Sequence, residues 1–521
     1  MSDLAGRLVE RLRGVGTRAL FGVPGGGGNL DLIEAAGRAG LPFVLTATET
    51  AAAIAAMAQA EVTGRPGGCL TTLGPGAASA VNGVACAYLD RAPMVVFTDS
   101  NPVGAAGMFA HQQLDQLALF APVTKWSGRV TEPDAEDVIE RAFAEVVGLP
   151  PGPVHLDCPG DVKSAGGASE PRVPRRPVPE TAGTVEKRSD PLLLIGLGAR
   201  QDAIAIRRFC ERLHVPAMVT YKAKGVVPDT HPCFAGVFTN GAIEREIIDR
   251  SNLLIGVGLD PVELLPRPWT IKTPIVGISR WRMADDHVPF ADQWVTDISS
   301  ALAQLEAEMR PSAWDLDAVA RVVREQRARV DLPASGLTPQ RVIDVAARAL
   351  ASTSRVTVDA GAHMFPATMS WPVAEPNGML ISNGLSTMGF ALPAAIGAAL
   401  ADRSRSVVAL TGDGGLLMCA GELLTAAREK LRVMTVVLND ASLSLIEIKQ
   451  QARRLPPAGV ALGAVKWAAL AESLGVAGFE AITEDGLSRA LDRAAAVDGP
   501  SLIDVKVDRS VYGEMLKVIR G

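Results

Sequence analysis

The chain has 521 residues, of which 48% are apolar and 21% charged, so it can form about three domains with sizeable buried cores. Its formal net charge of −6 argues against nucleic acid or an anionic membrane as the main partner. Every long apolar stretch is interrupted well before the ~20 residues of a membrane span. The amphipathic start does not resemble a signal peptide, and the six cysteines form no CxxC pair, so we expect buried thiols in a reducing cytoplasm.

Short apolar runs alternate with helical patterns between about residues 2 and 160. The expected strands are ALFGV, FVLTA, GCLTTL, MVVFTD and VHLDCP, and the expected helices span 29–39, 49–63 and 76–89. This alternation indicates a parallel sheet with helices on both faces. We therefore assign residues 1–165 to a first α/β domain, followed over 160–190 by a linker rich in proline and charge.

A second group of strands predicts a central α/β domain over residues 190–330. The strands LLLIGLG, AMVTY, LLIGVG and PIVGIS precede a charged helical segment. A Gly-X-Gly sequence follows two of them, at 196–198 and 256–258. A dinucleotide fingerprint requires another glycine three residues later, where the sequence has Gln201 and Pro261. We favour tight strand-end turns, and the alternative is a nucleotide site in this domain.

A third group occupies residues 336–521 and begins with the helical pattern TPQRVIDVAARAL. The strands VTVDAG, VVALTGDG, VMTVVLND and SLIDVKV follow. The plan is therefore three consecutive open α/β domains with mostly parallel sheets. One strand ends in GDGG, which contains Asp413, and the next ends at Asp440, with a helix expected over about 419–430. The interval allows one helical crossover, so the two strands should lie parallel and adjacent.

Asp413 and Asp440 should therefore converge at the carboxyl edge of the third sheet, where α/β sheets bind ligands. Two carboxylates among bare glycines repel each other unless a cation joins them. Oxygen ligands suit Mg²⁺, which shares its coordination shell readily with a phosphate. The glycines and a helix N-terminus would let backbone N–H groups approach that phosphate. The sequence thus predicts a magnesium–phosphate site.

This segment resembles the thiamine-diphosphate-binding motif, which begins with GDG and ends with NN after a similar interval. Other segments are similar to the acetolactate synthase and benzoylformate decarboxylase group: FGVPGG, TETAAAIAAMAQAEVTGRPG, LTTLGPGAASAVNGVACAYLDRAPMVVFTD, GAH and NGLSTMGFALPAAIGAAL. The resemblance implies a thiamine-diphosphate-binding fold in the first domain, which would bind the pyrimidine, and in the third, which would bind the diphosphate. It implies an enzyme dependent on thiamine diphosphate and Mg²⁺ that acts on a 2-oxo acid.

The resemblance also implies roles for individual residues. Glu49 matches the glutamate that hydrogen-bonds N1′ of the aminopyrimidine and activates the cofactor. Asp413, Asp440 and the Ser442 carbonyl would hold Mg²⁺, although the family usually has Asn where Asp440 stands. The remaining cofactor positions are Pro24, Pro75, Gly361, His363, Ser386, Met388, Gly412, Gly414 and Gly415, with Met388 supporting the bent cofactor. Each of two residues has an alternative, purely structural role. Glu49 could be a helix N-terminal glutamate that interacts with the helix dipole, and Met388 could be a core methionine.

The sequence indicates the cofactor more specifically than it indicates the reaction. In FAHQQLD, Gln112 matches a glutamine of the acetolactate synthase motif FQEVD, and His111 stands where that motif has Phe. Both are candidates for contact with the substrate, while a structural role for the histidine stays open. The RFDDR segment tied to FAD is absent near 256–264, so we do not expect FAD. A tryptophan tied to the second substrate is absent near Lys449.

We interpret the chain as an acetolactate-synthase-like enzyme that decarboxylates a 2-oxo acid and then ligates the product to a second carbonyl. The alternatives are a non-oxidative decarboxylase of the benzoylformate decarboxylase type, a 2-hydroxyacyl-CoA lyase, and a non-catalytic cofactor-binding or regulatory subunit. In the family the two domains that meet at one active site come from different chains. We therefore expect a homodimer as the minimal active unit and a homotetramer in the cytoplasm. The sequence does not name the substrate.

Overall fold

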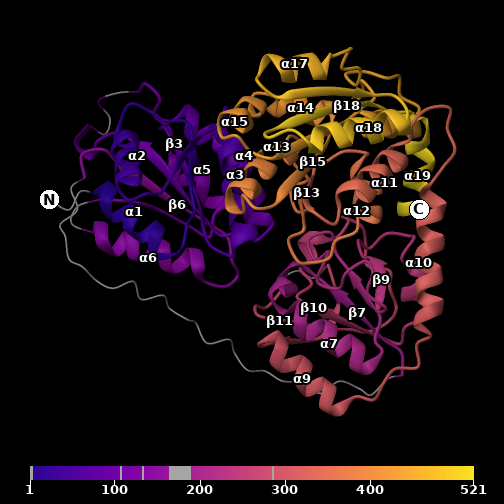
Figure 1. Ribbon diagram of the computed structural model, residues 1–521. Coiled ribbons are helices and arrows are strands. Elements are labelled where there is room, and N and C mark those ends of the chain that lie inside the picture. Colours follow the sequence, from indigo (N-terminus) through magenta and orange to yellow (C-terminus); the bar gives the residue numbers. More distant parts are fainter. Residues whose placement is uncertain (1–3, 106–107, 109, 132–133, 163–188, 284–286) are drawn as a thin grey trace.

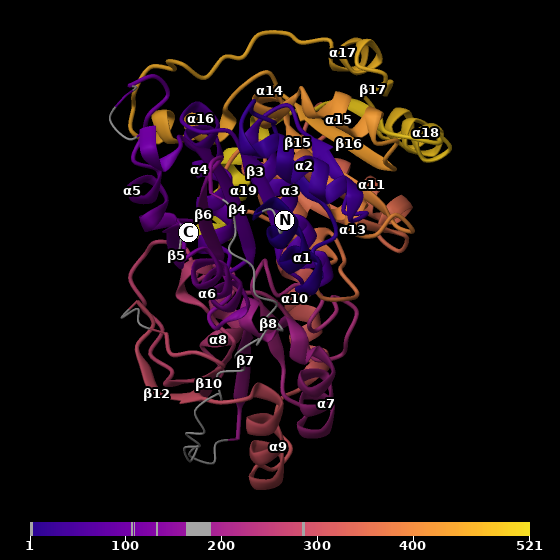
Figure 2. The same ribbon diagram turned by 90° about the vertical axis from the view of Figure 1, so that its left-hand side faces the viewer.

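Three sheets organise the molecule into three lobes, with the central domain below the other two (Figure 1). Figure 2 shows the same arrangement from the side. The computed structural model describes residues 4–105, 108, 110–131, 134–162, 189–283 and 287–521. Most of the expected linker, residues 163–188, lies outside the described residues. Each sheet has six strands and all strand pairs are parallel, which confirms the predicted class of three consecutive α/β domains.

The first sheet has the strand order β2-β1-β3-β4-β6-β5. Its strands are β1 (Leu20–Gly22), β2 (Phe43–Leu45), β3 (Gly67–Thr71), β4 (Met94–Ser100), β5 (Trp126–Arg129) and β6 (Pro153–Pro159). Its helices are α1 (Leu4–Gly14), α2 (Gly28–Arg38), α3 (Glu49–Thr63), α4 (Pro75–Leu89), α5 (Gln116–Phe120) and α6 (Ala135–Val147).

The third sheet repeats the topology of the first, with the order β14-β13-β15-β16-β18-β17. Its strands are β13 (Ser354–Val358), β14 (Met379–Ile381), β15 (Ser406–Gly412), β16 (Val433–Asn439), β17 (Ala477–Ala481) and β18 (Ser501–Lys506). Its helices are α11 (Pro339–Leu350), α12 (Met364–Ser370), α13 (Ala391–Ala401), α14 (Asp413–Cys419), α15 (Glu422–Arg428), α16 (Ser444–Ala452), α17 (Trp467–Ser473), α18 (Glu484–Ala495) and α19 (Tyr512–Arg520). The helix expected over 419–430 is therefore two short helices, the first of which begins at Asp413.

The central sheet has a different order, β12-β11-β10-β7-β8-β9, which is the arrangement of a dinucleotide-binding fold. Its strands are β7 (Pro191–Ile195), β8 (Ala217–Val219), β9 (Phe234–Val237), β10 (Leu253–Val257), β11 (Ile275–Ser279) and β12 (Phe290–Val295). Its helices are α7 (Ala203–Leu213), α8 (Arg245–Ile248), α9 (Ile298–Glu308) and α10 (Leu316–Val330).

The glycines that follow β7 and β10 pack against each other. A Cβ at Gly258, which has φ +58°, would collide with the backbone of Ala199, and a Cβ at Gly196 would collide with Leu259. The Leu197 N–H at this strand end donates to the carboxylate of Glu263 at 2.8 Å. Close approach of two turns is therefore a sufficient physical reason for these glycines.

The alanine-rich helix α3 joins the first and third domains. It is buried over most of its length and packs on α13 and α4. A Cβ at Gly397 of α13 would collide with the Ala55 carbonyl, and one at Gly83 of α4 would lie 2.6 Å from the Ala53 Cβ. Small side chains therefore allow these helices to cross at close range. Among the described residues, no helix combines the length and hydropathy needed to cross a membrane.

A buried ionic cluster lies where all three domains meet. The Lys222 ammonium, from the central domain, contacts Glu61 of α3, donates to Asp90 at 3.3 Å, and donates to the Ile381 carbonyl of the third domain at 3.1 Å. The Asp90 carboxylate also accepts the N–H groups of Asn383 and Gly384, at 3.2 and 2.7 Å. The start of the segment 383–388 is thus anchored to a charge from the first domain.

Candidate active site

A cleft of about 660 Å³ opens at the carboxyl edge of the third sheet and extends to the central domain. All ten residues that the sequence analysis assigned to the third domain's site line it: Gly361, His363, Ser386, Met388, Gly412, Asp413, Gly414, Gly415, Asp440 and Ser442. Residues far apart in the chain are therefore brought together at the edge where open α/β sheets bind ligands.

The two aspartates converge because β15 and β16 pair in parallel and end side by side. Asp413 Oδ2 accepts the Ala441 N–H at 2.7 Å, directly beside Asp440. Asp440 accepts the Ser442 N–H at 3.0 Å and the Ser444 hydroxyl at 2.6 Å. Ala441 has a positive φ of 57°, a conformation that a residue with a side chain adopts at a cost. The turn is therefore held in a strained shape, and both aspartates belong to the lining of the cleft.

Burial and the neighbouring charge of Asp440 raise the pKa of Asp413 to about 6. Burial also raises the pKa of Asp440. Near pH 7 Asp413 is therefore mostly ionised, and its desolvated negative charge faces the carboxyl group of Asp440. Across the described residues no three His, Cys, Asp or Glu side chains are grouped so that they could hold a metal ion by themselves. A cation here would therefore need further oxygens from a backbone carbonyl, water or a phosphate.

The rest of this edge has the shape and polarity that a diphosphate needs. A Cβ at Gly414 would lie 2.7 Å from a Leu443 methyl group, so the bare backbone leaves room that a side chain would fill. His363 Nε2 is buried and has no hydrogen-bond partner, and burial lowers the pKa of this imidazole to about 4. An unpartnered buried ring nitrogen beside a glycine cradle and two carboxylates fits a bound metal–diphosphate.

Ser386 and Met388 lie on the loop that follows the ionic cluster. Ser386 has a φ of 53°, another left-handed non-glycine residue. The Thr387 hydroxyl donates to Asn82 of α4 at 2.9 Å, and the Thr387 N–H donates to the Ser382 hydroxyl at 3.0 Å. Asn82 of the first domain and Ser382 of the third domain therefore hold this loop in a strained conformation, with Met388 half-buried in the cleft wall.

Glu49 lies outside the cleft, as the first residue of α3. Its side chain is half-buried, and its carboxylate has no hydrogen-bond or ion-pair partner among the described residues. A Cβ at Gly76 in the first turn of α4 would lie 3.0 Å from Glu49 Oε1. The Thr48 hydroxyl accepts the Ala51 N–H at 3.2 Å and caps the helix independently. Thr48 therefore supplies the side-chain cap, and a favourable interaction of the Glu49 carboxylate with the helix dipole stays its alternative role.

The other first-domain candidates are exposed and also lie outside the cleft: Pro24, Pro75, His111 and Gln112. Gln112 has a φ of 57°, and its backbone carbonyl packs against Gly74, beside Pro75. The buried Gln116 fixes this junction, because its carbonyl accepts the Gly74 N–H at 2.8 Å. Gln116 was not predicted from the sequence.

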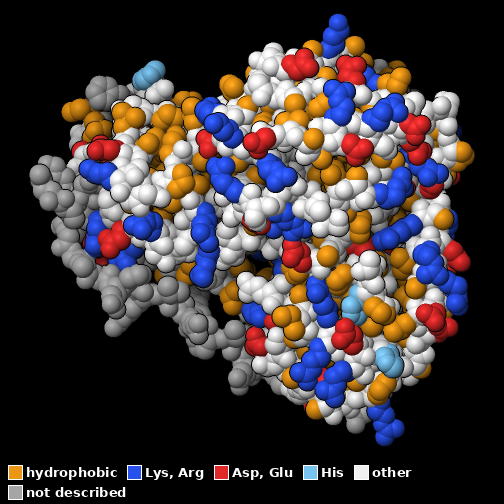
Figure 3. Space-filling model, in the orientation of Figure 1, with side chains coloured by type: hydrophobic (Ala, Val, Ile, Leu, Met, Phe, Trp, Pro, Cys, Tyr) orange, Lys and Arg blue, Asp and Glu red, His pale blue; other side chains and the backbone are white. Residues whose placement is uncertain are grey.

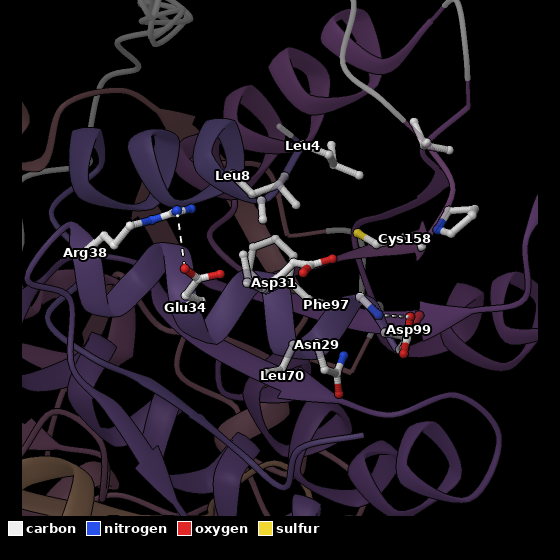
Figure 4. A pocket seen from close by; sticks show the side chains of 17 residues that line it. Leu4, Leu8, Asn29, Asp31, Glu34, Arg38, Leu70, Phe97, Asp99 and Cys158 are labelled. Atoms are coloured by element: carbon white, nitrogen blue, oxygen red, sulfur yellow. Dashed lines mark hydrogen bonds and ion pairs between the residues drawn. The ribbon is translucent and has the colours of Figure 1, made fainter. Parts of the chain in front are cut away.

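A network at the start of α2 shapes the loop after Pro24. Asn29 accepts the Gly25 N–H at 2.9 Å and donates to the Thr71 carbonyl at 3.2 Å, while Asp99 accepts the Gly28 N–H at 3.2 Å. These groups border a second hollow of about 320 Å³, in which Asn29 and Asp99 lie below α1 (Figure 4). The residues that line this hollow do not line the cleft, so the hollow is separate from the candidate site.

Two further acidic residues support the cleft and were not assigned from the sequence. Asp359 follows β13 and accepts the Thr411 hydroxyl at 2.9 Å and the Phe390 N–H at 3.3 Å, while burial raises its pKa to about 6. Glu447 accepts the Ser442 hydroxyl at 2.8 Å. Asp359 could have been found from the sequence. It follows a predicted strand in the run VTVDAG and therefore stands at the same sheet edge as Asp413.

Comparison with known proteins agrees with this geometry. Family models of the thiamine pyrophosphate enzymes match the chain in three parts: the N-terminal TPP binding domain at residues 3–119, the central domain at 178–305 and the C-terminal TPP binding domain at 359–505. The chain belongs to the thiamine pyrophosphate enzymes.

Three similar proteins indicate a narrower class of enzyme within this family. The acetolactate synthase isozyme 1 large subunit of Escherichia coli (strain K12) is 27% identical over 530 residues, covering 96% of this chain and 93% of the relative. An acetolactate synthase large subunit of Parasynechococcus marenigrum is 31% identical over 551 residues, covering 97% and 87%. A probable 2-ketoarginine decarboxylase of Pseudomonas aeruginosa is 30% identical over 525 residues, covering 96% and 93%. The chain is an acetolactate synthase-like enzyme that depends on thiamine diphosphate.

Proposed function

We propose that this enzyme uses Mg²⁺ with thiamine diphosphate to decarboxylate a 2-oxo acid and ligate the product to a second carbonyl compound. The observation that carries the proposal is the convergence of Asp413 and Asp440 in a glycine-lined cleft beside the unpartnered His363 nitrogen. The relatives named as acetolactate synthases favour ligation. The relative named as a decarboxylase favours the second candidate, release of the product as an aldehyde.

The chemistry that thiamine diphosphate supplies when bound is a carbon nucleophile and a place for the electron pair left by departing CO₂. Asp413, Asp440 and the Ser442 carbonyl would bind Mg²⁺, and His363 and the glycines would receive the diphosphate. Glu49 would share the proton at the pyrimidine N1′ from a half-buried position that strengthens this contact. Met388, Ser386 and Pro75 would orient the pyrimidine, and His111 and Gln112 would contact the substrate.

The test of the reaction is to incubate the purified protein with thiamine diphosphate, Mg²⁺ and a panel of 2-oxo acids, and to identify the products by mass spectrometry. We expect CO₂ release together with a 2-hydroxy ketone, where the second carbonyl compound is an aldehyde, or a 2-hydroxy-3-oxo acid, where it is a 2-oxo acid. Aldehyde as the sole organic product would favour the second candidate, and no consumption of any 2-oxo acid would contradict the proposal.

A second copy of the chain would complete the site. Glu49, Pro24 and Pro75 lie outside the cleft that their proposed partners line. Exposed apolar side chains lie near both halves of the proposed site. Leu114, close to Gln112 in the first domain, is 49% exposed, and Met418 on α14 of the third domain is 59% exposed. Figure 3 shows hydrophobic side chains gathered over the upper part of the first domain. An isologous homodimer would bring the two halves of the site together at two equivalent positions. The pairing of two such dimers would give the proposed homotetramer.

This arrangement predicts complementation between variants. Glu49→Gln and Asp413→Ala chains should each be nearly inactive. When they are refolded together, roughly half the dimers are mixed, and each mixed dimer has one intact site, so activity should recover to about a quarter of wild type. Native mass spectrometry would verify mixed dimers before the assay. Mixed dimers without activity would contradict a site shared between chains.

We also expect the purified protein to lack flavin. The segment 256–264 has no RFDDR-like sequence, and the Glu263 carboxyl group accepts the Leu197 N–H just after β7, where a dinucleotide pyrophosphate would bind. Denaturation should release no chromophore absorbing near 450 nm. Release of stoichiometric FAD, identified by mass spectrometry, would contradict this expectation.

A further inference from the structure

The lining of the cleft also includes a region with an unbalanced positive charge. This region is lined by Pro261 and Pro266 of the central domain, Phe365 of α12, Lys449 of α16 and Arg520 at the end of α19. Leu445 and Ile448 pack with α19 in one apolar cluster, which holds α16 and α19 together. Two basic residues from separate helices therefore line the same cavity as the candidate metal site.

Arg520 is held in place as a cation without a counter-ion. Its guanidinium carbon lies 4.5 Å from the centroid of the Phe365 ring, and Arg267 donates to its backbone carbonyl at 2.8 Å. Its Nε is buried without a hydrogen-bond partner, and no carboxylate of the described residues pairs with this side chain. Burial lowers the pKa of the Arg520 guanidinium, which is the mark of a desolvated charge. An anion that enters the cleft would therefore stabilise this desolvated guanidinium strongly, through charge-assisted hydrogen bonds.

The acids of the cleft do not neutralise this region. Lys449 is exposed and has no carboxylate partner among the described residues. Glu263 is the acid on the central-domain side, and it already accepts the Leu197 N–H at 2.8 Å and the Thr220 hydroxyl at 2.5 Å. Burial raises the pKa of Glu263 to about 8, so it is mostly neutral near pH 7. The other two lining acids, Asp413 and Asp440, face the proposed Mg²⁺.

We propose that Arg520, assisted by Lys449, binds a second carboxylate of the substrate, so that the preferred substrate is a 2-oxo dicarboxylic acid. This inference rests on the proposed function, because it assigns the substrate class of that same site. The carboxylate next to the 2-oxo group leaves as CO₂ and cannot be the lasting partner of a fixed guanidinium. A carboxylate at the distal end of the substrate matches the planar fork of Arg520 and keeps its contacts through the reaction.

The experiment compares 2-oxoglutarate with 2-oxopentanoate, which have the same chain length and differ by a carboxylate in place of a methyl group. The wild-type enzyme should prefer 2-oxoglutarate by about tenfold or more in kcat/KM, mainly through KM, the gain expected from a charge-assisted hydrogen bond. Arg520→Met keeps an unbranched side chain over Phe365 and should bring this ratio close to one. Arg520→Lys should restore part of the preference. Lys517→Met, on the exposed side of the same helix, should leave the ratio unchanged.

A binding measurement separates this inference from the proposed reaction. Glutarate has no oxo group and cannot react, so its affinity for the protein loaded with Mg²⁺ and thiamine diphosphate can be measured by calorimetry against that of pentanoate. We expect glutarate to bind more tightly, and this advantage to disappear in Arg520→Met. Equal binding of the two acids, or an advantage that survives in Arg520→Met, overturns the inference. Failure of every 2-oxo acid to react would count against the proposed function, while the glutarate result would still decide the anion site.

Discussion

Glu49→Gln should bind Mg²⁺ and thiamine diphosphate with nearly wild-type affinity and lose about 10²–10⁴-fold in kcat, the usual contribution of a general acid–base group. Glutamine preserves the size of the side chain but cannot share a proton at the pyrimidine N1′. The Glu49 carboxylate has no partner within the described chain, so the amide breaks no internal ion pair and the fold should persist. Cofactor affinity measured by calorimetry and steady-state rates measured on the same preparation give the two quantities.

The matched control is Glu34→Gln on α2, whose carboxylate is exposed and forms an ion pair with Arg38 at 3.4 Å. Exposed pairs of this kind contribute little to stability, so the control should keep wild-type kinetics. A Gly76→Ala variant adds a geometric test, because its Cβ would come within 3.0 Å of Glu49 Oε1 and displace the carboxylate. Near-normal kcat in Glu49→Gln would show that the proton at N1′ is handled by another group.

The second large effect concerns the metal. Asp413→Ala should weaken binding of the Mg²⁺–thiamine diphosphate complex by roughly 100-fold, since removal of one partner from a buried charge pair costs about 3 kcal/mol. Asp413 also accepts the N–H groups of Gly414 and Ala441, so the turn between β16 and α16 should loosen as well. Calorimetric titration with Mg²⁺ and cofactor measures the affinity directly.

Asp413→Asn distinguishes loss of the charge from loss of the turn. Asparagine keeps one oxygen, which can accept the N–H of Gly414 or that of Ala441 but not both, and it removes the repulsion from Asp440. The gain and the loss oppose each other, so the fold without metal should stay close to wild type in stability and above that of Asp413→Ala. Its affinity for Mg²⁺ should nevertheless fall. Asp498→Ala, in an exposed loop, is the matched surface control. Cofactor affinity that is unchanged in both Asp413 variants would place the metal elsewhere.

The interior strands of all three sheets were predictable from sequence, and most edge strands were not. Runs such as VVALTG and VMTVVLN are buried on both faces and therefore read as continuous apolar stretches. The strands that the sequence did not reveal are β5, β9, β12, β14 and β17, each of which lies at the edge of its sheet. An edge strand has one neighbour and is short or partly exposed, as in β5 and β12, so its composition carries no clear apolar run.

Local spacing by itself predicted where the two aspartates of the candidate metal site meet. Asp413 and Asp440 end two strands separated by a single crossover, and parallel pairing then places both side chains at one sheet edge. Tertiary structure alone decided which groups reach that edge. Glu49 stands outside the cleft, Asp90 anchors residues 383 and 384, and Arg520 lies over Phe365 without a counter-ion. These contacts join residues more than 150 positions apart and depend on how whole domains pack, which no periodicity in the sequence encodes.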